Sequence, residues 1–325
     1  MTDCRGREID YLRISVTDRC NLRCVYCMPE SGVAWTDHHQ ILSYEEIERL
    51  VRIFAGLGIS RVRLTGGEPL VRKDLSELVA RLKGVPGIRW VGLTTNGVLL
   101  EEQLPALTAA GLDAVNLSLD TLDRDQYRAI ARRDGLEAAL RGLNRARAVP
   151  GLTVKINCVP TGANRDQWVC LAGMAQAGPP LDVRFIELMP IGLGRGMDRR
   201  EEGEVLAALE AAFGPARVCP EKRGGGPARY VTFPGFAGRV GFISAVSHQF
   251  CGSCNRVRLT AGGLLKTCLQ YDAALDLKAL LRNGAEDWEL SARIREAVYR
   301  KPAGHHFGGG RTPGDEKHNM NEIGG

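Results

Sequence analysis

Short apolar runs alternate with longer amphipathic stretches between about residue 10 and residue 215. A short apolar run bounded by turn residues predicts a buried strand, whereas apolar positions spaced three and four residues apart predict a helix. Regular alternation of the two is typical of βα units that share a parallel sheet. The predicted strands begin near Tyr11, Arg61, Ile88, Asp113, Thr153 and Leu181.

The first predicted helix begins after Ser43. Ser43 and Glu46 have capping-box spacing, in which each side chain bonds to the backbone N–H of the other residue. Asp74 and Glu77 predict a similar start for the second helix. Apolar residues recur on one face of the first helix at Ile47, Leu50, Val51, Phe54 and Leu57.

Six βα units are too few for a closed eightfold barrel. We therefore expect an α/β fold built on an incomplete, open-sided (β/α)6 TIM-like barrel. The pattern changes at residues 220–227, where charged residues and glycines indicate a loop or linker. We expect residues 1–225 to form the barrel core and residues 226–325 to form a smaller C-terminal domain that contains its own cysteine group.

Composition narrows the class of protein. With 44% hydrophobic and 25% charged residues the 325-residue chain is typical of a soluble globular protein, and a net charge of +5 does not argue for nucleic acid. No apolar run is long enough for a membrane span or a signal peptide, so we expect a cytoplasmic protein. In that reducing compartment, ten cysteines indicate metal binding or catalysis rather than disulfides.

Three cysteines form a tight group directly after the first strand, at Cys20, Cys24 and Cys27. Three thiolates can hold a four-iron cluster and leave one iron without a protein ligand. The alternative is a zinc site completed by His38 or His39, although zinc sites favour CxxC pairs over this CxxxCxxC spacing.

A second group contains Cys251, Cys254 and Cys268. His248 could complete a zinc site here, and by spacing alone zinc is as good an interpretation as a second cluster. The first group favours the cluster, because it already indicates iron–sulfur chemistry.

Polar side chains occupy the strand positions that face the barrel interior. Alternation places Arg61, Arg63 and Thr65 on one side of their strand, and Val62 and Leu64 on the other. The other interior positions are Arg13, Ser15, Gly92, Thr94, Asn96, Asn116, Ser118, Lys155, Asn157 and Arg184.

A packed barrel is filled by Val, Ile and Leu, so this polar interior is unusual. Few acids share these positions, and unpaired buried cations are costly, so the cations predict an anionic ligand such as a triphosphate. Single arginines could instead lie solvated at the open rim. The chain has no Gly-Lys-Ser/Thr phosphate loop, which indicates that the triphosphate is a handle and not a phosphoryl donor.

The first cysteine group, with Tyr26 before its last cysteine, and the Gly-Gly-Glu-Pro segment at residues 66–69 resemble the radical S-adenosylmethionine (radical SAM) superfamily. The sequence CNRVRLT at residues 254–260, Gly-Gly-Leu at 262–264, Cys268-Leu269 and the final Gly324-Gly325 narrow the resemblance to the GTP 3′,8-cyclase family of molybdenum cofactor biosynthesis.

This resemblance implies two 4Fe–4S clusters, S-adenosylmethionine (SAM) and the substrate GTP. The SAM-binding positions that it implies are Tyr26, Gly67, Ser118 and Met189. The GTP-binding positions are Arg13, Arg61, Arg63, Thr94, Lys155, Arg184, Arg256, Val257 and Arg258. Catalytic roles are implied for Arg256, Arg258, Gly324 and Gly325, whereas residues 303–317 match no motif.

The implied activity is that of a lyase which converts GTP to 3′,8-cyclo-7,8-dihydro-GTP, the first step of the pathway. An external electron donor, a homodimer and contact with the next enzyme, cyclic pyranopterin monophosphate synthase, are further expectations, whereas nucleic acid and membrane are not expected as partners. One alternative is a radical SAM enzyme that modifies a peptide, but such enzymes usually carry more than three C-terminal cysteines. The other is a zinc-bearing binding module.

Overall fold

The computed structural model describes residues 1–33, 36–220, 224–310 and 312–324. Its strands form one sheet in the order β12-β11-β10-β1-β2-β3-β4-β5-β6-β9-β8-β7. The six middle strands are parallel and follow chain order, and each begins within two residues of its predicted start. They are β1 (Tyr11–Ser15), β2 (Arg61–Thr65), β3 (Trp90–Thr95), β4 (Ala114–Ser118), β5 (Thr153–Cys158) and β6 (Asp182–Ile186).

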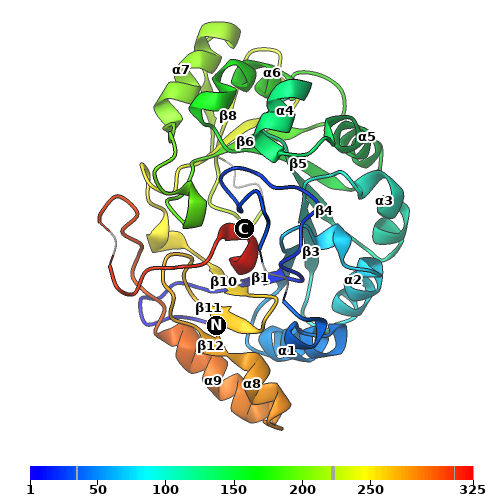
Figure 1. The fold of residues 1–325 in the computed structure, drawn as a ribbon, viewed down its shortest axis with the longest axis vertical. Helices are drawn as coiled ribbons and strands as arrows, with labels where there is room; N and C mark the ends of the chain where they lie inside the picture. Colours follow the sequence, from blue (N-terminus) through cyan, green and yellow to red (C-terminus); the bar gives the residue numbers. More distant parts are fainter. Residues whose placement is uncertain (34–35, 221–223, 311, 325) are drawn as a thin grey trace.

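Helices follow these strands and cover the outer side of the curved sheet (Figure 1). They are α1 (Tyr44–Gly56), α2 (Leu75–Lys83), α3 (Leu100–Ala109), α4 (Arg124–Ala131), α5 (Leu136–Arg147), α6 (Trp168–Gly173) and α7 (Glu202–Phe213). The ends of the strand order, β12 and β7, do not pair with each other among the described residues. The expected open, incomplete α/β barrel is therefore confirmed.

The C-terminal part of the chain extends this sheet at both edges. Next to β6 lie β9 (Val240–Ile243), which is parallel to it, and the antiparallel β8 (Arg229–Thr232) and β7 (Arg217–Cys219). At the other edge β10 (Arg256–Leu259) runs parallel to β1, followed by the antiparallel β11 (Leu264–Lys266) and β12 (Leu275–Asp276).

The predicted domain boundary between residues 225 and 226 falls in the loop of the β7–β8 hairpin. The charged residues 221–223 of that loop lie outside the described residues. Because strands on both sides of the boundary share one sheet, the division into two domains stays a prediction. Two further helices, α8 (Leu277–Arg282) and α9 (Asp287–Tyr299), lie beside α1 and the N-terminus in Figure 1.

The hydrophobic core lies between the sheet and the helices. Leu12, Ile14, Val62 and Leu64 are fully buried in it, as strand alternation predicts. The opposite face of the same strands is therefore left for polar side chains. The short helix α10 (Met320–Ile323) lies on this inner side of the sheet, close to the C-terminus (Figure 1).

The two predicted helix starts differ in outcome. Ser43 and Glu46 form the full capping box at α1. The second helix, α2, begins directly after Asp74 as predicted, but Asp74 adopts a left-handed conformation (φ 56°) and its side chain makes no cap hydrogen bond. Glu77 instead forms an ion pair with Arg81. Within the described ranges, no helix is both long enough and apolar enough to span a membrane.

Candidate active site

A cavity of about 310 Å³ opens at the carboxyl ends of the parallel strands, and both cysteine groups line it. The first triad is Cys20, Cys24 and Cys27, and the second triad is Cys251, Cys254 and Cys268. Barrel active sites lie at this end of the sheet. The fold thus brings together two groups that lie more than 200 residues apart in the sequence.

The first triad occupies one continuous loop after β1. Within the loop the Cys27 N–H donates to the Cys24 carbonyl oxygen at 2.9 Å. The loop is fixed to α4, because Arg23 N and Val25 N each donate to carbonyl oxygens at the end of that helix, both at 2.9 Å. Burial raises the pKa of Cys20 to about 11 and that of Cys27 to about 12.

The second triad comes from separate elements. Cys251 begins the short turn η5 (Cys251–Ser253), Cys254 follows it, and Cys268 lies just beyond β11. Burial alone would raise the pKa of Cys254, but the positive charges of Arg256 and Lys301 lower it to about 7. This triad is therefore held in a cationic environment.

The spacing of the sulfur atoms can be compared with what a zinc ion and a cluster each require. In neither triad do the three sulfurs all lie within 4.8 Å of one another. One tetrahedral zinc ion with Zn–S bonds of about 2.3 Å would bring its sulfurs within about 4 Å. The triads fit the larger iron–sulfur cluster better, and their all-sulfur donor sets suit it.

Two of the three histidines considered as zinc ligands, His39 and His248, do not join these triads. His248 is exposed and lies near Glu202 and Ser247, and neither it nor His39 lines the cavity. The side chain of His38 lies outside the part of the chain that the structure describes.

The four residues predicted to bind SAM all line the cavity next to the first triad. They are Tyr26, Gly67, Ser118 and Met189. The Tyr26 hydroxyl donates to Asp120 at 2.5 Å, which fixes the ring between the cysteine loop and the end of β4. Gly67 approaches the loop so closely that a Cβ atom there would lie 2.4 Å from the Arg19 carbonyl oxygen.

The residues predicted to bind GTP, most of them cations, lie in two layers. Arg13, Thr94, Arg256 and Arg258 line the cavity, and parallel pairing places Arg13 beside Arg258. Burial and then the charge of Arg258 hold the pKa of Arg13 well below its usual range. For Arg258, burial and then the charge of Arg256 lower the pKa to about 10.

The second layer lies deeper in the barrel. Arg63 donates to the Tyr11 hydroxyl at 2.6 Å and to the Leu93 carbonyl oxygen at 2.8 Å, and its guanidinium lies 4.7 Å from the centre of the Trp90 ring. Arg184 donates to Asn157 at 2.6 Å. Arg61 lies at the start of β2, against the backbone of Gly225.

Lys155 has an acidic partner that the sequence did not predict. Its ammonium lies 3.0 Å from the Asp182 carboxylate and donates to the Tyr230 hydroxyl at 2.8 Å. Asp182 stands opposite Lys155 on the next strand. The expectation that few acids share the inner face therefore needs this correction, because one cation is already neutralised.

Val257 differs from its neighbours, because its side chain is 1% exposed and packs in the hydrophobic core. Its side chain faces away from Arg256 and Arg258, as alternation requires. Any contact of Val257 with a substrate would come from its backbone.

Comparisons with known proteins identify the family. Residues 14–169 match the radical SAM superfamily and residues 181–307 match the family described as Molybdenum Cofactor Synthesis C. The chain is 49% identical to the GTP 3′,8-cyclase of Pelotomaculum thermopropionicum, with all of both chains covered. This chain belongs to the GTP 3′,8-cyclase family.

Other relatives give the same family assignment. The GTP 3′,8-cyclase of Heliobacterium modesticaldum is 47% identical over the full length of both chains. Molybdenum cofactor biosynthesis protein 1 of Mus musculus is 43% identical, over 94% of this chain and 48% of that protein. These matches confirm the prediction of a lyase of molybdenum cofactor biosynthesis that is a radical SAM enzyme.

The fold is also found in a distant solved structure. Streptococcus suis SuiB matches with a TM-score of 0.60 and 15% identity, over 91% of this chain and 67% of that one. At this identity the match speaks for the fold alone. It agrees with the partial barrel described above.

The C-terminal segment of this cyclase reaches the cavity. Arg258 donates to the Gly324 carbonyl oxygen at 2.7 Å, and Met320 lines the cavity, whereas Gly325 lies outside the described residues. Gly324 has φ +76°, and a Cβ atom there would lie 3.0 Å from Ser15 and Thr65. Glycine therefore suits this position.

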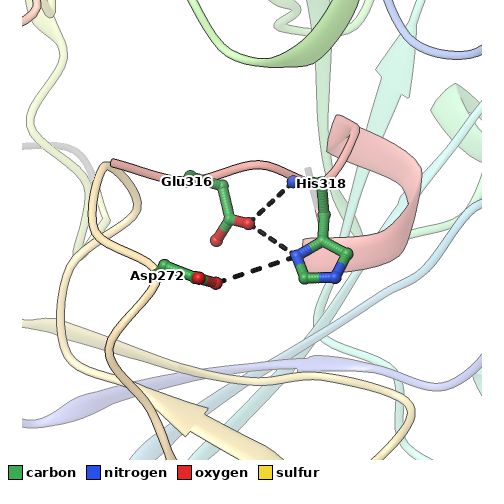
Figure 2. Close-up of side chains that lie close together, drawn as sticks. All are labelled: Asp272, Glu316 and His318. Atoms are coloured by element: carbon green, nitrogen blue, oxygen red, sulfur yellow. Dashed lines mark hydrogen bonds and ion pairs between the residues drawn. The ribbon is translucent and has the colours of Figure 1, made fainter. Parts of the chain in front are cut away.

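An ion-pair cluster anchors the same segment. His318 Nδ1 lies 2.7 Å from the Glu316 carboxylate and 4.0 Å from that of Asp272, and Figure 2 shows both acids facing this one ring nitrogen. This is the one group of three side chains with metal-ligand spacing among the described residues. The Lys266 ammonium forms a buried ion pair with Glu316, and its positive charge opposes a cation there.

Three acids that line the cavity were not among the predicted site residues, namely Glu68, Asp120 and Glu187. Burial raises the pKa of Glu68 to about 7 and that of Asp120 to about 6. Glu68 accepts hydrogen bonds from Leu70 N, Thr95 Oγ1 and Asn96 N. The Gly-Gly-Glu-Pro segment already contained Glu68, whereas only its place after β4 could have indicated Asp120.

Proposed function

We propose that each cysteine triad holds a 4Fe–4S cluster, that the first cluster binds SAM and that the second binds the base of GTP. The observation that carries this proposal is the shared cavity, which is lined by both triads and by Arg13, Arg256 and Arg258. Each triad offers three sulfur ligands, so each cluster would keep one iron for a small molecule. The enzyme thus acts on GTP as a 3′,8-cyclase.

Cys20, Cys24 and Cys27 would hold the first cluster, which together with SAM would supply the radical chemistry that removes hydrogen from ribose C3′ of GTP so that C3′ can bond to C8 of guanine. The chain itself has to hold the nucleotide with C3′ and C8 in reach of each other. We assign to Arg256 and Arg258 contact with the nucleotide and assistance in the final reduction; both lie on β10 and line the cavity together with the second triad, which supports the assignment.

The triphosphate would bind the cations of the inner face. We assign Arg13, Arg61, Arg63, Lys155, Arg184 and Thr94 to this role. Arginine forks match phosphate oxygens, and binding energy from a group remote from the reacting atoms can orient them. The Lys155–Asp182 ion pair makes Lys155 the weakest of these contacts, because its charge already has a partner.

Anaerobic reconstitution tests the assignment. Two four-iron clusters correspond to about eight iron atoms per chain. Incubation with GTP, SAM and a strong reductant should then give 5′-deoxyadenosine and a cyclised nucleotide. Zinc without iron, or iron without either product, would contradict the proposal.

Arg63→Ala tests the triphosphate contact. We expect GTP to bind at least tenfold more weakly, corresponding to about 1.4 kcal/mol, with iron content and SAM binding unchanged. Arg52→Ala is the matched control, because Arg52 is exposed and pairs with Glu48 on α1. Equal GTP affinity of the two variants, measured by equilibrium binding, would remove Arg63 from the site.

The remaining assignments concern partners. We propose that an external electron donor reduces the clusters, that the enzyme is a cytoplasmic homodimer and that cyclic pyranopterin monophosphate synthase receives its product. The proposal rests on the resemblance of the chain to its family. Sedimentation analysis of the reconstituted enzyme tests the dimer.

A further inference from the structure

The second triad lacks the continuous loop that holds the first one. Cys254 lies just before β10 and Cys268 just after β11, so both lie at the open end of this antiparallel hairpin, and Cys251 begins a separate three-residue turn. The hairpin pairs the strands that carry Cys254 and Cys268, but contacts from elsewhere in the chain must fix this open end against the turn of Cys251.

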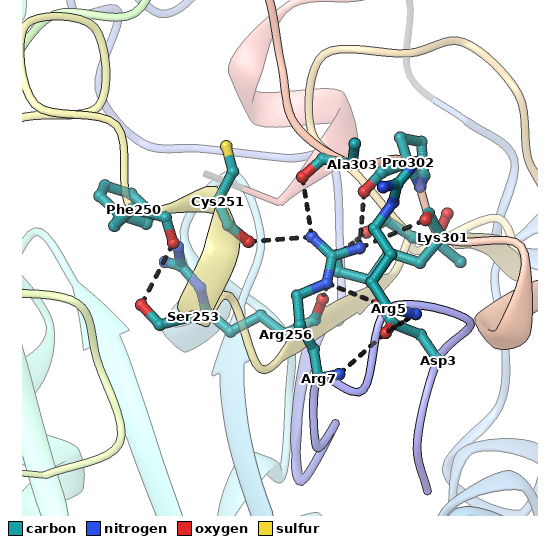
Figure 3. A network of polar contacts seen from close by, with 11 residues as sticks. Asp3, Arg5, Arg7, Phe250, Cys251, Ser253, Arg256, Lys301, Pro302 and Ala303 are labelled. Carbon is teal, nitrogen blue, oxygen red and sulfur yellow. Dashed lines mark hydrogen bonds and ion pairs between the residues drawn. The ribbon is translucent and has the colours of Figure 1, made fainter.

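Arg7, near the N-terminus, contacts this region directly (Figure 3). Its Nη1 donates to the Cys251 carbonyl oxygen at 2.9 Å and to the Ala303 carbonyl oxygen at 3.1 Å. Its Nη2 donates to the carbonyl oxygens of Pro302 at 2.6 Å and Lys301 at 3.2 Å. One guanidinium thus joins the turn of Cys251 to residues 301–303.

The bonding of Arg7 is complete. A guanidinium has five N–H donors, and the fifth, Nε, bonds to the Asp3 carboxylate at 2.6 Å. The side chains of Arg7 and Asp3 are 5% and 0% exposed. Asp3 is held in turn by the N–H groups of Arg5 and Arg7. A lysine has three donors and could not replace all these bonds.

Lys301 makes a second link of the same kind. Its buried ammonium donates to the Arg256 carbonyl oxygen at 3.0 Å and to the Thr267 carbonyl oxygen. Thr267 directly precedes Cys268, and Arg256 lies two residues after Cys254. Lys301 therefore ties together the two ends of the hairpin that carry these cysteines.

Residues 301–304 also pack on the triad itself. A Cβ atom at Gly304 would lie 3.2 Å from the Cys251 Cβ and 3.4 Å from its sulfur. The chain thus passes Cys251 at van der Waals distance, in the position that Arg7 fixes.

We propose that Arg7 and Lys301 form a carbonyl clamp, a pair of positioning residues that preforms the second triad by fixing the backbone at Cys251, Arg256 and Thr267. The proposal rests on the proposed second cluster. Neither residue is a cluster ligand. Second-sphere contacts of this kind orient metal ligands and affect metal binding strongly.

Arg7→Lys tests the clamp, since it keeps the positive charge and removes donors. We expect iron to fall from about eight toward about four atoms per chain after reconstitution. The electron paramagnetic resonance signal of the first cluster and cleavage of SAM should persist, whereas the signal that responds to GTP should be lost. Arg49→Lys is the matched control, because Arg49 is a half-exposed arginine bound to Asp287 and to a carbonyl oxygen.

Lys301→Met provides the second variant and should give the same selective loss. If the wild-type chain binds only about four iron atoms, the proposed second cluster fails. If it binds about eight but both variants keep eight, the clamp alone fails. Parallel loss of both clusters with a lower melting temperature would also overturn the clamp, because it would indicate a general role in folding.

Discussion

The two cysteine triads line one cavity but are built differently. The first lies on one loop, and its neighbours Glu68 and Asp120 are acids. The second joins separate elements, and its neighbours Arg256 and Lys301 are cations. A short loop can place three ligands by itself, whereas scattered ligands need contacts from elsewhere in the fold.

The surroundings of the two triads also shift the pKa values of their thiols in opposite directions. Burial raises the pKa of Cys20 and Cys27, whereas neighbouring cations lower the pKa of Cys254. Cations beside the second triad suit an anionic nucleotide as well as thiolates. The barrel therefore combines the proposed site for SAM with a more positive proposed site for GTP.

The largest expected effect is the loss of one triad. Cys24→Ala should leave about four iron atoms per chain and abolish formation of 5′-deoxyadenosine. Cys268→Ala should also leave about four iron atoms but should keep slow cleavage of SAM without a cyclised product. Iron analysis and chromatography of the nucleosides measure both. Loss of all iron in either variant would show that the triads are not independent.

A smaller effect is expected when one glycine beside each triad is replaced by alanine. Gly67→Ala should weaken the first site, because its Cβ would lie 2.4 Å from the Arg19 carbonyl oxygen. Such overpacking typically costs about 1–3 kcal/mol. We expect weaker SAM binding and a lower melting temperature, measured by equilibrium binding and calorimetry.

Gly252→Ala is the matched change in the second loop. Nothing lies within 4 Å of a Cβ atom at Gly252, so we expect stability to change by less than about 0.5 kcal/mol. If both alanine variants behave alike, close packing of Gly67 is not what distinguishes the first site.

The sequence predicted the local features of both regions well. The strand starts and the α1 capping box depend on neighbouring residues and on periodicity, and the cysteine spacing of the first triad is itself a local motif. The structure places all six cysteines on one cavity, which the spacing of the cysteines alone did not predict. Asp74 precedes α2 as predicted, but its backbone is left-handed and its side chain forms no cap hydrogen bond, so only the capping part of that prediction was wrong.

The periodicity of the sequence could not predict which residues far apart in the chain would contact each other. Pairing Lys155 with Asp182 requires the register of β5 against β6, and bringing Arg13 next to Arg258 requires β10 to join β1 across some 240 residues. Arg7 bonds to Cys251 over a similar separation. Such contacts depend on the assembled sheet, so no local pattern around Arg7 indicated its role.

The smallest effect concerns the reactivity of the thiols in the cluster-free chain. A thiolate is the reactive form, and its fraction rises as the pH passes the pKa of the thiol. Cys254, with a pKa of about 7, should reach half its maximal alkylation rate near pH 7. Cys20, with a pKa of about 11, should react slowly at pH 8 and still gain rate above pH 10.

At pH 8 most of Cys254 would be thiolate, compared with roughly one part in a thousand of Cys20. A thiolate of low pKa is the weaker nucleophile, which reduces the expected advantage of Cys254 to about tenfold. Anaerobic iodoacetamide labelling followed by mass spectrometry measures both rates in the same sample. Removing the charge with Arg256→Met should move the Cys254 profile to higher pH and leave Cys20 unchanged. Matching pH profiles of the two thiols in the wild-type chain would mean that the cations do not set the second triad apart.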